Sequence, residues 1–495
     1  MVTPMRVPQS PALTGVITLF LAGCVSSAGL RPTAQPLAAD QLTAARSLAG
    51  TPLSPAAWPR ADWWTTFADP ELDRLVQQAL AGNPDLAAAD ARARLADAQA
   101  GAADAARAPQ IGAGISSSGI RIPSTVIPRP YGGHYSALDR IGLNFSYTFD
   151  LWGGHRAAWE AAVDRGHAAE VDAAAARLTL AADVARAYAT LGAAERTRTI
   201  ADSELRRATQ VLELTRQRVG AGIDNRLDLD QAAAAVAAAT ADLAAQQRSV
   251  VLARVALAAL LGRGPDATFT LTAHPLPPAA LALPADLPAA LLGRRPDIVA
   301  ARWRIEAAAR EIHAARAAFY PDLNLAAGLG LASLGGGSLL ETASRYEQFG
   351  PALSLPLFDG GRLRANLAGR NAGYDLAVAQ YNQTLIEALR QVAASVAALR
   401  TLDRESSAAR QARADAASAW KIALIRYRAG IGSYIEALTV ERGLLAAEQR
   451  VATLDAARVV QSIGLVQALG GGYAPTAATA DPVPVPVPAV AEVHP

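Results

Sequence analysis

Hydrophobic and polar residues alternate strictly in two stretches of the chain. Apolar residues occupy every second position from Ile141 to Leu151, and small or polar residues occupy the positions between them. Residues 323–332 show the same alternation, with leucine or alanine at each odd position. Because successive side chains of a strand point to opposite faces, both stretches are predicted to be strands with one apolar face. Such a strand suits either a membrane wall, with lipid on one side and water on the other, or the half-buried sheet of a soluble protein.

A second strand is expected beside each of these. Residues 111–120 follow a proline that ends a helical stretch, and residues 350–358 repeat the alternation until Pro356 interrupts it. Proline cannot donate a hydrogen bond to a neighbouring strand, so Pro356 marks a strand end or a sheet edge. With residues 140–151 and 323–332, the chain is therefore expected to contribute four strands.

Two long helices are predicted after the two strand pairs. Residues 154–219 and 362–429 contain no proline, and glycine-containing turns bound both stretches. At 1.5 Å per residue, a helix of about 65 residues spans about 100 Å. In the second stretch apolar residues recur at spacings of three and four, the heptad pattern of helices packed side by side. These residues are Val378, Tyr381, Leu385, Leu389, Val392, Val396 and Leu399.

Shorter helices are predicted to complete each half. Residues 84–107 and 226–261 together are nearly as long as the first long helix, and residues 296–319 and 434–469 bear the same relation to the second. Stacked end to end, each pair would run beside its long helix as one interrupted partner. The expected fold is therefore mainly α, a coiled-coil-like bundle of long helices, with four β-strands at one end.

The same order of elements occurs twice, which indicates an internal two-fold sequence repeat. Asn83-Pro84-Asp85-Leu86 matches Arg295-Pro296-Asp297-Ile298, 212 positions later, and Gly220-Ala221-Gly222-Ile223 matches Arg428-Ala429-Gly430-Ile431, 208 positions later. Four strands cannot close a barrel, and lipid does not tolerate an open edge, so other chains must complete the wall. Two chains would supply eight strands around an interior filled by side chains, and three would supply twelve around a lumen.

The first 23 residues have the features of an export signal. Arg6 is followed by an apolar stretch, residues 13–21, that is too short to span a bilayer permanently. The stretch ends at Leu21-Ala22-Gly23-Cys24, which resembles the site at which bacterial lipoproteins are cleaved and acylated. Cys24 is therefore predicted to carry S-diacylglycerol and N-palmitoyl groups, and the alternative is an inert thiol. Val25, rather than aspartate, favours sorting to the outer membrane.

Composition excludes several classes of function. The 495 residues carry a net charge of +2, without the clustered basic excess of a nucleic-acid binder. A single cysteine excludes an intramolecular disulfide and a multi-cysteine metal site. The six histidines are scattered, and the chain has neither a glycine-rich phosphate loop nor a nucleophile elbow. We therefore expect no enzyme, no catalytic residue, no metal site and no cofactor other than the covalent lipid.

No transmembrane helix is expected after the signal. The most apolar stretch, residues 249–261, is interrupted by Arg254. If the chain crosses a membrane, it must do so as strands.

The junctions between elements resemble those of the TolC-like outer membrane efflux proteins, in the lipoprotein subgroup called NodT-type. The resemblance rests on Phe149–Gly153 and Pro356–Arg362 after the strands, Arg294–Ile298 at the midpoint, and Arg218–Gly222 and Arg426–Gly430 where the long helices end. It implies a homotrimer with a 12-stranded barrel in the outer membrane and an α-helical barrel through the periplasm. The implied partners are outer membrane lipid, a periplasmic adaptor (membrane fusion) protein and an inner-membrane pump of the resistance-nodulation-division (RND) type.

The resemblance also implies a gate, because in this family polar contacts and an acidic ring close the periplasmic end. By position, Tyr427 would hold the closed state through its hydroxyl, and Ile435 would form an apolar constriction. Glu436 would belong to the acidic ring. Thr439 stands where many relatives carry aspartate, so the ring is altered or is carried by Glu436 alone.

A further group of tip residues is expected to support this gate. Asp224, Asp228 and Asp230 are candidate salt-bridge partners, with Arg226 or Arg426. Each of them has an ordinary alternative as a solvated charge or a helix cap beside a glycine turn. The turn residues expected to contact the adaptor are Gly220, Gly222 and Gly430.

The expected division of the chain follows from the repeat. The parts are a signal peptide (1–23), an N-terminal lipidated segment and equatorial region (24–82), a first efflux repeat (83–262), a linker or equatorial segment (263–294), a second efflux repeat (295–470) and a disordered tail rich in proline and valine (471–495).

The leading function is a passive outer membrane channel of a tripartite efflux pump that exports drugs or other small molecules. An outer membrane channel for type I secretion or metal efflux would have the same shape, so the sequence names neither the cargo nor the cognate pump. A non-pore periplasmic coiled-coil lipoprotein is a rival of another class, but it would need no amphipathic strands. A lipid-anchored hydrolase is disfavoured by the missing catalytic residues.

Overall fold

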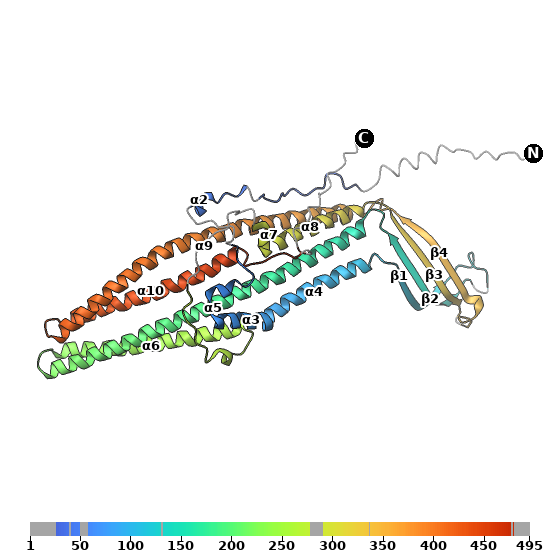
Figure 1. The fold of residues 1–495 in the computed structure, drawn as a ribbon. Helices are drawn as coiled ribbons and strands as arrows, with labels where there is room; N and C mark the ends of the chain where they lie inside the picture. The colour runs from blue at the N-terminus through green and yellow to red at the C-terminus, as the bar shows by residue number, and fades with distance from the viewer. Residues whose placement is uncertain are drawn as a thin grey trace, which may run out of the picture.

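The chain forms an elongated molecule with a β-sheet at one end and two helical hairpins at the other (Figure 1). The computed structural model describes residues 26–38, 41–49, 58–129, 132–277, 291–335, 337–476 and 479. The predicted signal peptide, Cys24 and the valine–proline part of the tail lie outside the described residues. Each half of the chain has a short helix, two strands, a long helix and a returning helix, in that order.

Two long helices run the length of the helical part. α5 (Gly154–Gly220) and α9 (Arg362–Arg428) each have 67 residues, which corresponds to about 100 Å. α6 (Arg226–Leu260) and α10 (Tyr434–Ala468) return beside them from the far end (Figure 1). These bounds differ from the predicted ones by one residue.

The short helices α4 (Pro84–Ala105) and α8 (Pro296–Ala317) lie beside the long helices near the sheet. They meet the ends of α6 and α10. The Asn83 amide nitrogen donates to the Leu260 carbonyl oxygen at 2.8 Å, and Arg295 Nη1 donates to the Ala468 carbonyl oxygen at 2.9 Å. The returning helix and the short helix of each half are therefore stacked end to end, as their lengths predicted.

The sheet has four antiparallel strands in chain order. They are β1 (Gln110–Arg121), β2 (Tyr135–Phe149), β3 (Asp322–Leu334) and β4 (Arg345–Ser354).

The predicted bounds were least accurate for the second and fourth strands. β2 ends at Phe149 because the Asp150 carboxylate instead accepts the backbone N–H groups of His155 and Arg156 at the start of α5. β4 spans 345–354 rather than 350–358. Its C-terminal limit follows from Pro356, which cannot donate to a neighbouring strand, and from Asp359, which accepts from Gly361 N and Leu363 N at the start of α9.

The apolar stripe of α9 packs in one of the two main core clusters, with α8 and the end of α10. Six of the seven predicted heptad residues are buried there, but Leu389 is only half-buried and Ala388 takes its place. Ala388 lies seven residues after Tyr381 and seven before the buried Ser395, so it keeps the heptad repeat, whereas Leu389 lies one residue off it.

Two expectations need correction. Among the described helices, α6 alone is long and apolar enough to cross a membrane by length and composition, with a mean hydropathy of 1.2 over its most apolar 18 residues. It is nevertheless paired with α5, where Arg254 donates to Glu195 at 2.8 Å.

The predicted tail begins with ordered residues, because three glycines with positive φ, 470–472, turn the chain back and Tyr473 packs on the cluster around Trp303.

Candidate functional site at the helical tips

The turns at the ends of the two hairpins have the same backbone geometry. Gly222 and Gly430 lie in the left-handed region, with φ of 76° and 75°. Behind them, Ile223 N donates to the Arg218 carbonyl oxygen at 2.9 Å and Ile431 N donates to that of Arg426 at 3.1 Å. This is the usual way in which a glycine closes a helix end, so the predicted turn glycines are required by the backbone.

Gly220 differs from the other two glycines. It is the last residue of α5, and its φ is not positive. A Cβ placed on Gly220 or Gly222 would meet nothing within 4 Å, so both positions have open space beside them.

One salt bridge fastens the turn between α5 and α6. Arg218 donates to both carboxylate oxygens of Asp224, through Nε and Nη2, each at 2.8 Å. Both side chains are about nine-tenths buried, at 10% exposure each. Such a two-point contact fixes orientation as well as charge, so the turn is held rigidly against the end of α5.

Tyr427 joins this turn to α9. Its side chain is fully buried, and its hydroxyl lies 2.7 Å from Asp224 Oδ2 and 2.8 Å from Thr215 Oγ1. Because the carboxylate can only accept, Tyr427 donates to Asp224, and the single Thr215 hydroxyl proton is shared between the Tyr427 oxygen and the Val211 carbonyl oxygen, which lies at 2.9 Å. Arg218 also donates from Nη1 to the Tyr427 carbonyl oxygen at 2.8 Å, and its guanidinium lies 4.6 Å from the ring centroid.

These contacts shift the pKa of each of the three side chains so that its charge state at neutral pH is stabilised. Hydrogen bonds from Arg218 lower the pKa of Asp224, even though burial opposes the shift. Burial, together with the Asp224 carboxylate, raises the pKa of Tyr427 to about 12. Hydrogen bonding to Asp224 raises the pKa of Arg218. The network is therefore ionised as Arg218⁺ and Asp224⁻, with a neutral Tyr427, across the neutral range.

The predicted partners of the acidic residues were partly wrong. Asp224 pairs with Arg218, not with Arg226 or Arg426. Asp228 forms a capping box with Asn225 at the start of α6, with its backbone N 3.1 Å from the Asn225 side-chain oxygen. Its side chain accepts from the Asn225 backbone, so it serves as a helix cap. Two exposed ion pairs complete the tip, Arg226 with Asp230 at 3.5 Å and Arg426 with Glu436 at 3.4 Å.

The other predicted gate residues lie on a separate surface. Ile435, Glu436 and Thr439 are exposed on the first turns of α10, whereas Tyr434 and Ala437 of the same turns are buried beneath Tyr427. Ile435 is 57% exposed. Thr439 donates its hydroxyl to the Ile435 carbonyl oxygen at 2.8 Å within the helix. The structure thus separates an outward surface of α10 from the buried network around Tyr427.

The sequence did not predict a second polar cluster, which lies between α5 and α10 farther from the turns. Arg207 of α5 bridges Glu204 at 2.7 Å and Glu448 of α10 at 3.1 Å. Beside it lies Glu441 of α10, which is 2% exposed and has an oxygen, Oε1, without a hydrogen-bond partner. Burial raises the pKa of Glu441 to about 7, helped by the nearby Glu204. The burial of Glu441 could have been predicted from the sequence, because it shares a heptad spacing with Tyr434, Ala437 and Leu444.

An extended N-terminal arm, residues 26–38, runs along the outside of α9. At its start the Arg364 guanidinium donates to the Ser26 carbonyl oxygen at 2.5 Å, in the first turn of α9 beside the sheet. Farther along, the Asp375 carboxylate accepts from Thr33 N, Thr33 Oγ1 and Ala34 N at 2.8 to 3.0 Å. The arm therefore begins at the level where the sheet meets the helices.

The face of the sheet that carries the odd-numbered residues is apolar toward the helices, whereas Asp139, Arg345 and Glu347 lie on the same face toward its far end. Ile111, Phe145, Ala327 and Phe349 form one row across the four strands, and Ile111 and Phe349 are 74% and 77% exposed. Below the sheet, Trp152 stacks on Tyr320 with centroids 4.7 Å apart. Within the described residues β1 and β4 each pair on one side only, so this apolar face ends in two open edges.

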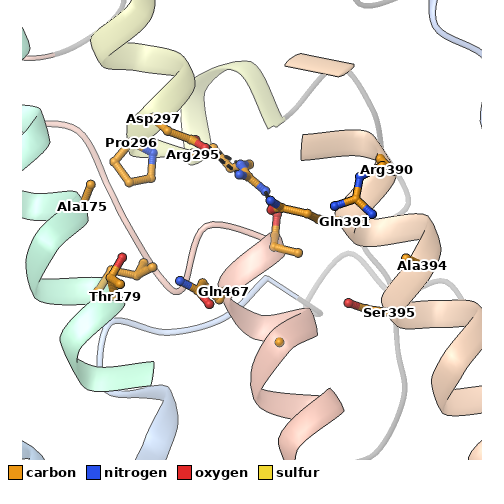
Figure 2. Close-up of a pocket in the computed structure, with 13 residues that line it drawn as sticks. Ala175, Thr179, Arg295, Pro296, Asp297, Arg390, Gln391, Ala394, Ser395 and Gln467 are labelled. Carbon is orange, nitrogen blue, oxygen red and sulfur yellow. Dashed lines mark hydrogen bonds and ion pairs between the residues drawn. The ribbon is translucent and has the colours of Figure 1, made fainter. Parts of the chain in front are cut away.

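A polar cavity of about 410 Å³ lies where α5, α8, α9 and α10 meet (Figure 2). Arg295 crosses it and is already satisfied by Asp297, by Gln391 at 3.0 Å and by the Ala468 carbonyl oxygen. Arg390 is paired with Glu387 at 2.5 Å. The cavity is therefore part of the joint between α10 and α8. Within the described ranges no group of three or more His, Cys, Asp or Glu side chains is placed to hold a metal ion.

Comparison with known proteins places these features in context. The sequence profile described as "Outer membrane efflux protein" matches residues 75–263 and 287–471. The multidrug resistance outer membrane protein MdtP of Escherichia coli is 34% identical over 441 residues, which covers 85% of this chain and 88% of that protein. The fusaric acid resistance protein FusA of Burkholderia cepacia is 37% identical over 382 residues, covering 74% and 71%. The crystal structure of the outer membrane protein VceC from Vibrio cholerae aligns with a TM-score of 0.77 at 35% identity, covering 84% of this chain and 100% of that one.

Proposed function

The chain belongs to the outer membrane efflux protein family, and on that premise we propose that three copies form the outer membrane channel of a tripartite efflux pump. The observation that carries the proposal is the sheet with two open edges. Its apolar face suits lipid, and unpaired edges are not tolerated in a bilayer, so β1 of one copy would pair with β4 of the next. Three copies supply the twelve strands that leave a lumen.

The position of the aromatic pair supports the same orientation. Trp152 and Tyr320 lie where the strands end and the helices begin, at the depth where aromatic residues gather at a membrane surface. With the sheet in the membrane, the helical part would extend about 100 Å into the periplasm. The hairpin tips would then meet a periplasmic adaptor, through the turns around Gly222 and Gly430 and the neighbouring Gly220.

We further propose that Cys24 carries the lipid anchor. The arm supports this, because its first described residue, Ser26, is held beside the first turn of α9 at the edge of the sheet. Cys24 lies two positions earlier, within reach of the inner surface of the same membrane. Acyl chains on its sulfur and amine would give stable attachment, since more than one chain exceeds the marginal binding of a single one.

The tip network would hold the closed state of the channel. Asp224 joins the α5–α6 turn to Tyr427 of α9, so the two hairpins separate only if this contact breaks. Around a three-fold axis, the outward surface of α10 would present Ile435, Glu436 and Thr439 to the lumen as a constriction. Opening would be driven by the adaptor and the inner-membrane pump of the RND type, and the channel itself would be a passive conduit without catalysis.

The cargo is proposed to be small organic molecules. MdtP and FusA are named for multidrug and fusaric acid resistance, and both align over more than two thirds of their length. A secretion channel or a metal-efflux channel of the same shape remains the alternative, and transport assays with the cognate pump would distinguish them.

Purified protein tests the channel directly. We expect native mass spectrometry to give a trimer, and planar bilayers to show stepwise conductance after the gate is weakened by Asp224→Asn. A well-folded monomer, or a trimer that never conducts with this substitution, would instead favour a periplasmic spacer. A mass that lacks the lipid increment at residue 24 would contradict the anchor while leaving the pore proposal intact.

A further inference from the structure

A row of glycines crosses the sheet on the face opposite the apolar one. Gly114, Gly142 and Gly330 are direct neighbours in β1, β2 and β3, and Tyr346 of β4 continues the row. Directly paired residues of antiparallel strands point to the same face. Tyr346 is therefore the one residue of this row with a side chain.

The tyrosine ring lies flat across its glycine neighbours. A Cβ placed on Gly142 would lie 2.6 Å from the Tyr346 hydroxyl oxygen, although Gly142 is two strands away. In the next row, a Cβ on Gly328 would lie 3.8 Å from Tyr346 Cε2. The ring thus extends from β4 over Gly330 and places its hydroxyl above Gly142. A side chain at Gly142 would occupy the space that the ring needs.

This face is the polar one. It carries Asn144, Ser146 and Thr148, and Asn324 donates to Thr148 Oγ1 at 3.0 Å. In the proposed trimeric barrel, where lipid covers the odd-numbered residues, these side chains line the lumen. Three Tyr346 side chains would then surround the lumen at one level.

We propose that Tyr346 determines the free width of the lumen within the membrane, and that Gly142 keeps its ring flat against the wall. The inference rests on the proposed trimeric channel. A ring that lies flat takes up about 3.5 Å of depth, one carbon–carbon contact distance, whereas an upright ring would project its full length from three sides. Gly142 is thus placed to give the widest passage that an aromatic residue at this level permits.

A single lumen thiol can measure this width. Ser146 lies on the same face, closer to the helical part than the tyrosine row, and its replacement by cysteine changes only oxygen to sulfur. With Cys24 acylated as proposed, this is the one free thiol of the Ser146→Cys protein, and the natural protein gives the background rate. With the tips closed, a reagent reaches it from the open end of the barrel and must pass Tyr346. The rate is measured with N-ethylmaleimide and with polyethylene-glycol maleimides of increasing mass.

Gly142→Ala is expected to slow the bulky maleimides at least tenfold and to leave N-ethylmaleimide unchanged. The matched control is Gly114→Ala, which adds a methyl group to the same row where nothing lies within 4 Å. It should change neither rate. A Cβ on Gly142 would also lie 2.7 Å from the Leu329 carbonyl oxygen, so a backbone shift must be separated from the ring effect. That separation comes from the Tyr346→Ala background, in which Gly142→Ala should have no effect.

Equal slowing by the two alanine substitutions, or slowing that persists without Tyr346, would overturn the inference. If Gly142→Ala does not assemble, Tyr346→Ala is compared with Gln348→Ala on the same face of β4. Only Tyr346→Ala should increase the rate at which the bulky maleimides react, and equal rates for the two variants would again overturn the inference. If trimers with Ser146→Cys resist even N-ethylmaleimide, the polar face does not line a lumen, and the proposed channel fails rather than the role of Tyr346.

Discussion

The Asn83 side chain links two helices that are 177 positions apart in the sequence by donating to the Leu260 carbonyl oxygen at 2.8 Å. Its own oxygen accepts from Asp85 N at 2.7 Å and so caps α4. In the second half, Arg295 occupies the corresponding position and donates to the Ala468 carbonyl oxygen at 2.9 Å. In each half, a side chain at the start of the short helix thus donates a hydrogen bond to a backbone carbonyl that is left unpaired at the end of the returning helix. The short helix and the returning helix are therefore joined and act together as one long partner of α5 or α9.

Asn83→Ala should weaken this joint. The substitution removes an N-cap, worth about 1 kcal/mol, and leaves a buried carbonyl unpaired at a further cost of about 1 to 3 kcal/mol. We expect the temperature at which the trimer dissociates to fall by several degrees. Asn366→Ala, at an exposed position of α9, is the control and should cause no shift. Equal midpoints for the two variants would show that the contact does not stabilise the fold.

The fold was largely predictable because its signals are local. Pro84 and Pro296 begin the short helices, glycines with positive φ follow the ends of the long ones, and the alternation is uninterrupted over residues 141–149 of β2 and 323–331 of β3. The start of β4 at Arg345 was missed because its first residues do not alternate, and their place in the sheet comes from pairing with β3. That pairing joins Arg345 to Leu331, a contact that no local pattern encodes.

The contacts at the hairpin tip were predicted less well than the fold, because they depend on how the turn directs each side chain. Arg218 and Arg226 lie on either side of Asp224, and the sequence indicated Arg226 or Arg426 as the partner of the acidic residues. The turn at Gly222 reverses the chain, so it returns Asp224 to the end of α5 and directs Arg226 to solvent, where it is 85% exposed. The pairing depends on turn geometry rather than on spacing. The N-terminal arm escaped prediction because its partners, such as Asp375, lie more than 300 positions away.

Asp224→Asn should open the channel. An amide cannot accept two charge-assisted hydrogen bonds from Arg218 as strongly as a carboxylate, and a contact of this kind contributes about 1.5 to 3 kcal/mol. If the contact holds the tips closed, the ratio of closed to open channels falls by about 10- to 100-fold. Tyr427→Phe removes one hydrogen bond and should act in the same direction but less strongly. The measurement is the open probability of single trimers in planar bilayers.

Asp230→Asn is the matched control for the gate. It removes the same negative charge from the same hairpin tip, but Asp230 is exposed and lies 3.5 Å from its partner Arg226, so this pair should contribute little. A rise in open probability as large as that of Asp224→Asn would show that net charge at the tip, and not the buried network, controls opening.

Glu441 should make the α5–α10 interface pH-dependent. Burial raises its pKa from 4.5 to about 7, and the charged groups around it are Glu204 and Arg207 of α5 and Arg442 of its own helix. With a raised pKa, the folded protein binds a proton that the unfolded chain has already released. The contribution of Glu441 to stability is therefore greatest below about pH 4.5 and is lost as the pH rises through about 7, by about 3 kcal/mol per copy.

Glu441→Gln isolates this contribution from those of the other ionisable groups. Glutamine resembles the protonated acid, so the variant should match the natural protein near pH 4.5 and be more stable at pH 8. The dissociation temperature of the trimer, measured at both pH values, gives the difference directly. Parallel curves for the two proteins would show that Glu441 is already ionised in the folded state.

Asp375→Ala should release the N-terminal arm from α9. The carboxylate accepts three hydrogen bonds from Thr33 and Ala34, and these bonds lower its pKa although burial opposes the shift. Without it, residues 26–38 lose their central attachment while Arg364 still holds the start of the arm, so we expect limited proteolysis to cut the arm faster with the trimer intact. Asp415→Ala is the control, because Asp415 is exposed and contacts only Gln411 of its own helix in the described structure. If both variants are cut at the natural rate, the hydrogen bond from Leu37 N to Asn382 at 2.8 Å and the apolar contacts of Leu30 and Leu37 with the core are sufficient to hold the arm.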